Sequence, residues 1–270
     1  MTLLPLVVSP TDLVTANNKP VKLLDLRATE AFLDSHLPAA VSADAALLNR
    51  SNPPAGGLLP EEQTVNRLLA EAGIHSGDHI VAYDTGAATQ AARLIWVLHA
   101  FGFTQCSWLN GGFEAWQHAG LATESGSSEP AVGSLRLTRV ADNQISVEQL
   151  MAELADPALS IVDTRTAAEY AGTDIRSAKG GHVPGAQHFD WNDLFGPDKR
   201  LRDDKDLLAE FAAIGVAAGK KTVVYCQTHQ RSAVTYVVLK HLGFLHIRAL
   251  DGAWSNWGNR HDTPKATMDS

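Results

Sequence analysis

Cys226 ends a short β-branched run and is followed by a polar loop and then by an apolar helical pattern. This order predicts a strand, a tight loop and a helix that begins near Arg231 or Ser232. Because the first amides of a helix lack intrahelical partners, residues 227–231 can turn their N–H groups toward the sulfur and favour a negative charge there. The helix dipole acts in the same direction. The sequence therefore predicts a Cys226 thiolate that can act as a nucleophile, rather than a small buried apolar side chain.

The spacing of this loop indicates which anion it holds. The phosphate-binding loops of tyrosine and dual-specificity phosphatases read C-x5-R, whereas Arg231 follows Cys226 by five positions, which makes the ring of amides one residue smaller. A smaller ring suits one sulfur atom carried on the thiolate, as a persulfide, better than a tetrahedral phosphate. The segment from Cys226 to Ser232 resembles the active loops of the rhodanese (thiosulfate sulfurtransferase) family, which read C-x-x-G-x-[RT].

The chain contains an internal repeat that covers most of its length. Residues 23–32 match residues 161–170, and the loop residue Asp84 aligns with Cys226. The further matched segments are 36–40 with 182–186, 80–84 with 222–226, 100–103 with 241–244, and 109–116 with 250–257. Two copies of one unit are therefore predicted, joined by a stretch rich in Ser, Gly and Pro.

Within each copy, short apolar runs alternate with helical patterns, which favours a parallel sheet covered by helices. The family resemblance implies the same α/β class, with two tandem rhodanese-like domains, each doubly wound around a parallel sheet. We predict an N-terminal domain over residues 1–122, a linker over 123–136 and a C-terminal catalytic domain over 137–270.

The two copies differ at the candidate nucleophile. Asp84 occupies the position of Cys226, and the loop after it is one residue longer before the matching helix. A carboxylate can accept hydrogen bonds from the loop amides and keep the loop folded without chemistry, so the N-terminal domain is predicted to be catalytically inactive. In two-domain members of the resembled family the N-terminal domain is likewise inactive, and the active site lies where the domains meet.

The candidate active-site loop comprises Gln227, Thr228, His229, Gln230, Arg231 and Ser232. His229 stands where many rhodaneses have glycine, so either this position does not need a positive φ or histidine tolerates one with strain. The loop carries neither the lysine of vertebrate-type thiosulfate sulfurtransferases nor the Gly-Ser pair of mercaptopyruvate sulfurtransferases. Apart from Arg231 the loop is nearly neutral. Thiosulfate is a dianion whose binding benefits from further positive charge, so the loop alone does not identify the sulfur donor.

Two candidate sources of that charge lie in residues 172–182, an insertion without a counterpart of its length in the first copy. In related enzymes basic residues of this region approach the substrate anion, which makes Arg176 the first candidate for substrate binding and Lys179 the alternate. Either side chain is as readily an ordinary solvated group. Arg231 also has an alternative role, since its guanidinium can point away from the sulfur and brace the loop through a carboxylate.

Two kinds of polar motif recur in both copies, an Asp-x-Arg pair and a His-x-Pro segment. Their presence in the copy without a cysteine indicates structural roles, namely a shared salt bridge or loop brace and a loop-stabilising hydrogen bond. The residues concerned are Asp25, Arg27, Asp163, Arg165, His36 and His182.

Length and composition limit the class of protein. The chain has 270 residues, enough for two domains, and its formal charge of −8 argues against a nucleic-acid or anionic-membrane partner. No stretch approaches the ~20 apolar residues of a membrane span, and no positively charged leader pattern opens the sequence, so we expect a cytoplasmic protein. Cys106, in a predicted buried strand, and Cys226 fall in different predicted domains, which makes a disulfide unexpected and fits a reducing compartment.

The main hypothesis is a two-step transfer. The Cys226 thiolate takes the sulfane sulfur of a donor such as thiosulfate, and cyanide or a thiol then removes it from the Cys226 persulfide. No dissociable cofactor is expected, because the persulfide mechanism needs none. No metal is expected either, because His75 and His79 have no nearby cysteine or carboxylate cluster of metal-site spacing. The expected partners are a small-molecule sulfur donor and acceptor, with a protein acceptor as the alternative.

Three other functions stay open. A 3-mercaptopyruvate sulfurtransferase would use a different donor at the same cysteine. A phosphatase is disfavoured by the length of the loop. A persulfide carrier that serves a partner protein in iron–sulfur or selenium metabolism would show poor turnover by itself, and a partner would accelerate its sulfur delivery.

Overall fold

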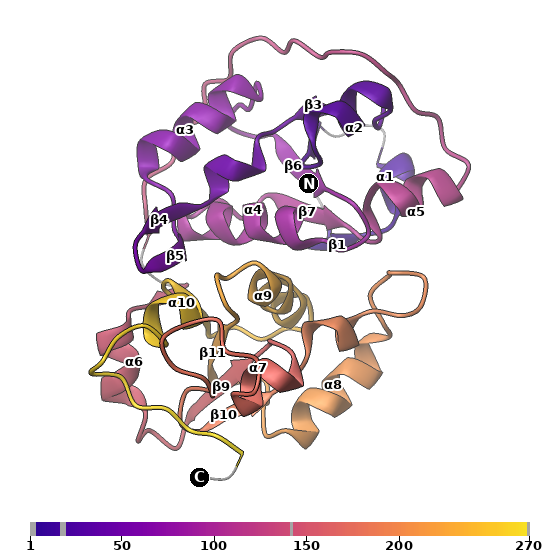
Figure 1. Cartoon of the computed structure of the whole chain (residues 1–270). Coiled ribbons are helices and arrows are strands. Elements are labelled where there is room, and N and C mark those ends of the chain that lie inside the picture. Colours follow the sequence, from indigo (N-terminus) through magenta and orange to yellow (C-terminus); the bar gives the residue numbers. More distant parts are fainter. Residues whose placement is uncertain (1–3, 17–19, 141–142, 269–270) are drawn as a thin grey trace. The chain divides into compact units, whose positions relative to one another are not determined.

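The computed structural model describes residues 4–16, 20–140 and 143–268. Figure 1 shows the chain coloured along its sequence. Contacts between Cα atoms divide it into two compact units, each assembled from segments that are not continuous in sequence. Unit 1 consists of Met1–Leu48, Pro60–Val140 and Pro197–Leu201, and unit 2 of Asn49–Leu59, Ala141–Gly196 and Arg202–Ser270.

Unit 1 is built on a parallel sheet. Its strands are β1 (Val7–Val8), β2 (Val21–Asp25), β3 (Val41–Ser42), β6 (His79–Tyr83) and β7 (Cys106–Leu109). Their order in the sheet is β1-β7-β6-β2-β3, so the chain crosses over between neighbouring strands. Every residue of the central strand β6 is buried, as expected where both faces of a parallel sheet are covered.

Unit 2 repeats this sheet. Its strands are β8 (Gln144–Ile145), β9 (Leu159–Asp163), β10 (Ala186–His188), β11 (Lys221–Tyr225) and β12 (Ile247–Leu250). The order is β10-β9-β11-β12-β8, in which β11 takes the central place of β6, and all pairings are parallel. The predicted pair of α/β domains with parallel sheets is confirmed.

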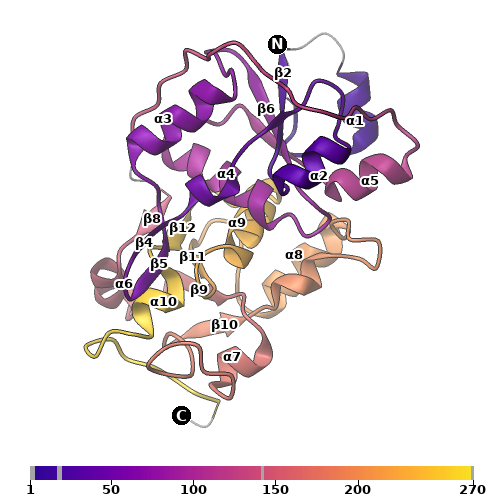
Figure 2. The same ribbon diagram turned by 45° about the horizontal axis from the view of Figure 1, so that its top comes forward.

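Helices cover both faces of each sheet (Figure 2). In unit 1, α1 (Pro10–Thr15), α2 (Thr29–Asp34) and α5 (Gly112–His118) bury Leu13, Phe32 and Phe113 on one face, and α3 (Glu62–Glu71), α4 (Thr89–Ala100) and the 3₁₀ helix η1 (Ala45–Leu48) lie on the other. In unit 2 the corresponding elements are α6 (Val147–Glu153), α7 (Ala167–Ala171) and α10 (Ala253–Trp257), opposite α8 (Asp204–Ala213), α9 (Arg231–His241) and η2 (Trp191–Leu194).

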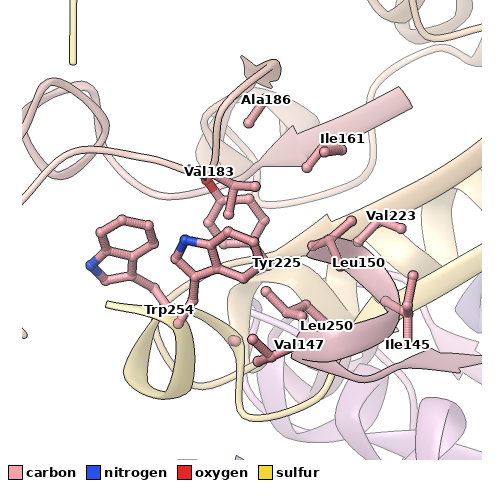
Figure 3. Packing of buried hydrophobic residues seen from close by; sticks show 12 residues of the cluster. Ile145, Val147, Leu150, Ile161, Val183, Ala186, Val223, Tyr225, Leu250 and Trp254 are labelled. Carbon is pink, nitrogen blue, oxygen red and sulfur yellow. Dashed lines mark hydrogen bonds between the residues drawn. The ribbon is translucent and has the colours of Figure 1, made fainter. Parts of the chain in front are cut away.

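An apolar cluster fixes one face of the unit 2 sheet (Figure 3). Trp254 of α10 packs against Tyr225 at the end of β11, with ring centroids 6.3 Å apart, and Val147 and Leu150 of α6 complete the layer. Ser146, the predicted N-cap of α6, accepts a hydrogen bond from the Gln149 amide. This packing stabilises the strand that ends just before Cys226.

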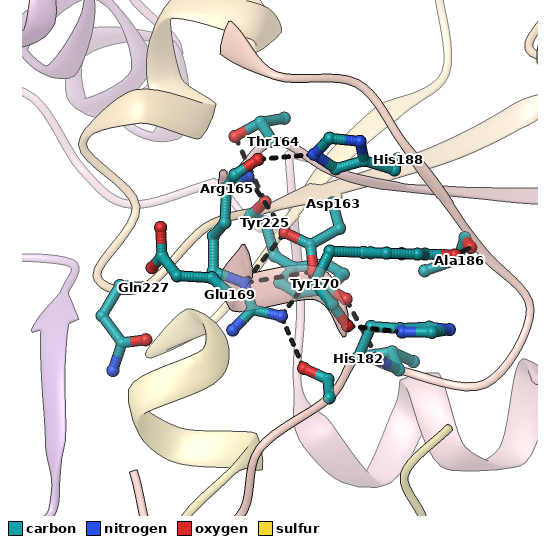
Figure 4. A network of polar contacts seen from close by, with 12 residues as sticks. Asp163, Thr164, Arg165, Glu169, Tyr170, His182, Ala186, His188, Tyr225 and Gln227 are labelled. Atoms are coloured by element: carbon teal, nitrogen blue, oxygen red, sulfur yellow. Dashed lines mark hydrogen bonds and ion pairs between the residues drawn. The ribbon is translucent and has the colours of Figure 1, made fainter. Parts of the chain in front are cut away.

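The recurrent Asp-x-Arg motif is a buried salt bridge in both units, as predicted. In unit 2 the Arg165 Nη2 lies 2.5 Å from Asp163 Oδ2 and donates to the Gly181 carbonyl at 2.7 Å (Figure 4). In unit 1 the distance from Arg27 Nη2 to Asp25 Oδ2 is 2.6 Å. Each arginine therefore ties the end of a strand to the loop that leads to the next one.

The recurrent histidines are also structural, as predicted. His182 Nδ1 lies 2.9 Å from the Tyr170 carbonyl oxygen, and the two rings stack at 3.7 Å. His36 repeats both contacts with Phe32, at 2.8 and 3.9 Å. Each hydrogen bond closes the end of a short helix, α7 or α2, against the loop that follows.

Two short segments belong by their contacts to the unit of the other repeat. Residues 49–59 form an antiparallel hairpin of β4 (Arg50–Asn52) and β5 (Ala55–Leu58) in unit 2, and residues 197–201 lie in unit 1. Both segments follow a 3₁₀ helix, η1 or η2, and precede the next helix, so they occupy equivalent places in the repeat. The domain boundaries predicted from the sequence assign each repeat to one continuous stretch. They therefore miss that residues 49–59 belong to unit 2 and residues 197–201 to unit 1.

The segment predicted as a linker, residues 123–136, is hydrogen-bonded along unit 1. Glu124 and His36 exchange backbone hydrogen bonds of 2.8 and 2.9 Å, and the Gly133 amide donates to the Ala70 carbonyl at 2.8 Å. Its chain is therefore held by backbone bonds at both ends.

Both cysteines are free and buried. Cys106 lies within β7, as predicted for a core residue, and burial raises the pKa of its thiol well above the usual value. Of the helices in residues 4–16, 20–140 and 143–268, none is long and apolar enough to span a membrane.

Removing the arginine of the buried pair leaves an unpaired carboxylate in the core. We expect Arg165→Met to lower the free energy of unfolding by about 3–5 kcal/mol, as measured by urea denaturation. The control is Lys221→Met, because Lys221 forms an exposed ion pair with Asp156 and should contribute less than about 1 kcal/mol. Equal losses in the two variants would contradict the structural role of Arg165.

Candidate active site

Cys226 lies directly after β11, the central strand of unit 2, and α9 begins five residues later at Arg231. The predicted order of strand, loop and helix is confirmed. Cys226 is only 1% exposed, so its side chain is largely removed from water. Any charge on its sulfur must therefore be stabilised by groups of the loop itself.

The start of α10 holds the first carbonyl groups of the loop. The Trp254 amide donates to the Cys226 carbonyl at 2.9 Å, and the Ser255 amide donates to the Gln227 carbonyl at 2.9 Å. Through these two bonds, the N-terminal amides of α10 hold the backbone of the loop in place where it follows β11.

The loop amides themselves are available for a ligand. In the part of the chain that the structure describes, the N–H groups of Gln227, Thr228 and Gln230 donate to no protein acceptor. Orphan amides before a helix are suited to bind an anion. A negatively charged sulfur on Cys226 would supply the missing acceptor.

The matching loop of unit 1 shows how such amides are satisfied. Asp84 Oδ2 accepts hydrogen bonds from the Gln90 amide at 2.8 Å and the Ala91 amide at 3.2 Å, as the sequence predicts for a carboxylate at this position. A left-handed residue precedes each helix, Ala88 with φ 58° and His229 with φ 54°. These residues come four positions after Asp84 and three after Cys226, which confirms that the unit 1 loop is one residue longer.

This correspondence extends into the first turn of the helix. Aligning Ala88 with His229 places the amides of Arg231 and Ser232 where Gln90 and Ala91 contact their carboxylate. The two residues are the first of α9, and their N–H groups have no intrahelical acceptors.

His229 tolerates a positive φ, which is the second of the two expectations for this position. Its φ is 54°, and its buried ring places Nδ1 2.6 Å from the Ser232 hydroxyl oxygen. The left-handed region costs less for glycine than for histidine, and the bond to Ser232 offsets part of that strain.

Arg231 braces the loop through a carboxylate. Its two terminal nitrogens donate to Glu169 at 2.6 and 2.8 Å, and the Glu169 side chain is fully buried. Burial opposes ionisation of Glu169, but the hydrogen bonds and charge of Arg231 lower its pKa to about 2. Burial opposes the charge of Arg231, but its hydrogen bonds and ion pair with Glu169, together with its contact with Cys226, hold the pKa of Arg231 above its usual value.

Arg176 lies at the exposed edge of this ion pair. Its Nη2 is 2.8 Å from Asp174 Oδ2, and its Nε is 3.8 Å from Glu169 Oε1. The Gln227 side chain donates to the Arg176 carbonyl at 3.2 Å and to the Ser177 hydroxyl at 3.1 Å. The insertion that carries Arg176 is thus bonded to the residue next to Cys226.

Lys179 makes different contacts. Its Nζ donates to the carbonyl and hydroxyl oxygens of Thr263 at 2.6 and 2.7 Å, and its amide donates to the Gly258 carbonyl. The ammonium group is thereby used to hold the segment after α10. Of the two predicted sources of positive charge, Arg176 is the one that contacts the Glu169–Arg231 pair.

Comparison with known proteins agrees with this geometry. The model of the rhodanese-like domain matches the chain twice, at residues 9–119 and 146–260. The chain belongs to the rhodanese-like family. The two matches also confirm the internal repeat and the resemblance that the loop carries.

Three relatives of this rhodanese represent different functions. A thiosulfate sulfurtransferase of Pseudomonas aeruginosa is 36% identical over 262 residues, which is 97% of each chain. The sulfur carrier protein TtuD of Thermus thermophilus is 27% identical over 280 residues, again 97% of each. SseA from Escherichia coli, a 3-mercaptopyruvate sulfotransferase, has a crystal structure that superposes with a TM-score of 0.82 at 26% identity and covers 93% of this chain and 99% of its own. These relatives confirm the predicted sulfurtransferase class.

Sequence reasoning did not identify Glu169, Ser255 and Asn49 as site residues. Glu169 has a local signal, since Thr166-x-x-Glu169 is a capping box that opens α7. Its bond to Arg231, 62 positions away, depends on how α7 packs and has no local signal. Ser255 and Asn49 contact the loop only through tertiary structure, with no pattern that marks them.

Burial of Asp84 makes the stability of the rhodanese depend on pH. Burial raises its pKa to about 7, although the Ala91, Gln90 and Ala88 amides lower it. The folded-state pKa of Asp84 thus lies above its unfolded value of about 4, so the folded state favours the protonated carboxyl. The resulting contribution to the free energy of unfolding is complete below about pH 4 and is lost as pH rises through about 7. Asp84→Asn should remove this loss, so that the variant gains up to about 4 kcal/mol on wild type between pH 4 and 8.

Thermal midpoints of both proteins across this pH range measure the effect. The control is Glu30→Gln, which changes an exposed carboxylate and should run parallel to wild type. A difference between Asp84→Asn and wild type that does not change with pH would contradict a protonated Asp84.

Proposed function

We propose that this rhodanese is a thiosulfate sulfurtransferase that carries sulfane sulfur as a persulfide on Cys226. The observation behind the proposal is a buried cysteine at the start of a loop whose Gln227, Thr228 and Gln230 amides have no acceptor among the described residues. The similarity to the thiosulfate sulfurtransferase of Pseudomonas aeruginosa along nearly the whole chain supports thiosulfate as the donor.

In the first step the Cys226 thiolate attacks the sulfane sulfur of thiosulfate. A bond forms between the Cys226 Sγ and that sulfur, and the sulfur–sulfur bond within thiosulfate breaks. Sulfite leaves with the electron pair of the broken bond. The outer sulfur of the resulting persulfide carries the negative charge, so it takes over the role of acceptor for the loop amides.

In the second step a nucleophile removes the outer sulfur. Cyanide attacks it, the bond to Cys226 Sγ breaks, and thiocyanate leaves while the thiolate is restored. The two half-reactions share one covalent intermediate, so the kinetics are ping-pong. A dissociable cofactor has no part in either step, because both electron pairs move between sulfur, carbon and Cys226.

The loop stabilises this chemistry mainly with peptide dipoles. Glu169 neutralises Arg231, so the pair contributes little net charge. The amides of Gln227, Thr228 and Gln230, which donate to no acceptor among the described residues, and the dipole of α9 supply the stabilisation in this proposal. Arg176 supplies the charge at the edge of the site, where a side chain that is 53% exposed can meet an incoming dianion.

Small-molecule partners and a cytoplasmic location complete the proposal. Both cysteines are free thiols, which fits a reducing compartment. The formal charge of −8 opposes binding to nucleic acid or an anionic membrane. A thiol or a protein could replace cyanide as the acceptor.

A persulfide carrier is the second candidate. The similarity to the sulfur carrier protein TtuD supports it, and so does a loop without the lysine and Gly-Ser signatures. A carrier would take one sulfur from the donor but turn over slowly with cyanide until an acceptor protein is added. Mercaptopyruvate, tested beside thiosulfate in the same assay, distinguishes the alternative donor.

Replacing the nucleophile tests the proposal. Cys226→Ser should keep its fold by circular dichroism and lose thiosulfate-dependent thiocyanate formation by a factor of at least about 10³. Cys106→Ser is the matched control and should retain the rate, because Cys106 lies in β7 of the other unit. Turnover that survives in Cys226→Ser would overturn the assignment.

The charge at the edge of the site sets the affinity for thiosulfate. Arg176→Ala should raise KM for thiosulfate about three- to tenfold and leave kcat nearly unchanged, since one charge-assisted contact contributes about 1 kcal/mol. The control is Arg67→Ala, which removes an equally exposed arginine paired with Glu71 in unit 1. A KM that is the same in both variants would show that Arg176 is only a solvated side chain.

A further inference from the structure

The hairpin of β4 and β5 comes from the catalytically inactive repeat, yet its contacts place it in unit 2. It packs on α10, the short helix whose first amides hold the carbonyls of Cys226 and Gln227. The hairpin and the catalytic loop are therefore separated in sequence but joined in one compact unit.

One connection runs through Ser255. The Gly56 amide donates to the Ser255 hydroxyl at 2.9 Å, although the two residues are 199 positions apart. The amide of Ser255 donates to the Gln227 carbonyl at 2.9 Å. Ser255 thus connects the hairpin to Gln227, the loop residue next to Cys226.

A second connection is direct contact between backbones. Gly57 has a φ of 65°, and a Cβ placed on it would lie 1.9 Å from the Thr228 carbonyl oxygen and 2.5 Å from its carbon. Both atoms belong to the main chain and have no side-chain freedom to yield. Only a residue without a Cβ allows the hairpin to approach Thr228 this closely.

A third connection uses side chains. The Gln230 carboxamide nitrogen donates to Asn49 Oδ1 at 2.7 Å. Gln230 is the residue before α9, so this bond fixes the loop where it joins the helix. Together with the two contacts above, the hairpin segment holds three of the residues between Cys226 and Arg231.

The inactive loop has an equivalent support. Residues 197–201 of the second repeat lie in unit 1, where the Leu201 amide donates to Asn110 Oδ1 at 2.9 Å. A Cβ on Gly86, within the loop after Asp84, would lie 3.0 Å from Lys199 Cβ. Each repeat thus supports the loop of the other, but only the support at Cys226 acts on a nucleophile.

We propose that residues 49–59 position the catalytic loop, with Gly57 as the residue that sets the distance to Thr228. The inactive repeat then contributes to catalysis by holding the Cys226 loop amides in the arrangement that binds the persulfide sulfur. This role rests on the proposed function of Cys226, because it presumes that the loop geometry limits sulfur transfer.

The test compares two glycine substitutions in the full chain. Gly57→Ala and Gly120→Ala introduce the same methyl group at nearly the same φ, 65° and 68°, but a Cβ at Gly120 meets nothing within 4 Å. The rate of Cys226 persulfide formation from thiosulfate is measured in a single turnover at a temperature where both variants are fully folded. Gly57→Ala should be slower than wild type by about 10- to 100-fold, and Gly120→Ala should match wild type.

A second readout separates positioning from general destabilisation. Alkylation of Cys226 by iodoacetamide reports the reactivity of the thiolate without thiosulfate, and it should change in Gly57→Ala but not in Gly120→Ala. If Gly57→Ala does not fold, Asn49→Ala takes its place, with Asn66→Ala as the control because Asn66 bonds Leu137 in unit 1, away from the Cys226 loop. Equal rates in a variant and its control overturn the positioning role.

These outcomes are distinct from failure of the proposed function. If Cys226→Ser abolishes transfer while Gly57→Ala and Gly120→Ala transfer sulfur at the same rate, only the role of the hairpin is refuted. If Cys226→Ser still transfers sulfur, the proposed function fails first.

Discussion

The first amides of α9 have no acceptor within the helix, and the loop before it is shaped by this constraint. Each repeat places a side chain that can accept hydrogen bonds from such amides directly after its central strand. In unit 1 the group is Asp84, whose carboxylate accepts two of the amides and completes the loop. In unit 2 it is Cys226, and among the residues that the structure describes the amides of Gln227, Thr228 and Gln230 donate to no protein acceptor. One fold therefore gives a closed structural loop in one repeat and a receptive loop in the other.

The electrostatics of unit 2 follow from how its arginine is used. Arg231 would be the obvious group to attract an anion, but Glu169 engages both of its terminal nitrogens. A buried ion pair with good geometry orients a loop more than it attracts charge, because its net charge is close to zero. In the proposed mechanism the sulfur is therefore stabilised by dipoles at short range, and Arg176 acts from the exposed edge. The proposal thus separates capture of the donor from stabilisation of the intermediate.

Much of this organisation could be predicted from the sequence. The repeat, the α/β class, Asp84 opposite Cys226 and the salt bridge of Asp163 with Arg165 all depend on local patterns or on matching two copies. Two features could not be predicted, because they depend on tertiary packing. Lys179 binds Thr263 instead of facing the loop, since the segment after α10 passes beside it.

The other unpredicted feature is the exchange of residues 49–59 and 197–201 between the units. Each of these segments lies inside its own repeat in sequence, and only the contacts of the folded chain assign it to the other. In our proposal the repeat without a cysteine supports the loop on which the proposed chemistry depends.

The central claim is that Cys226 carries the transferred sulfur, and intact mass tests it most directly. The protein is weighed before thiosulfate, after thiosulfate and after cyanide, with Cys226→Ser treated in parallel. We predict that the wild-type chain gains the mass of one sulfur atom, that cyanide removes it and that the variant never gains it. An equal gain in Cys226→Ser, or no gain in the wild type, would contradict a Cys226 persulfide.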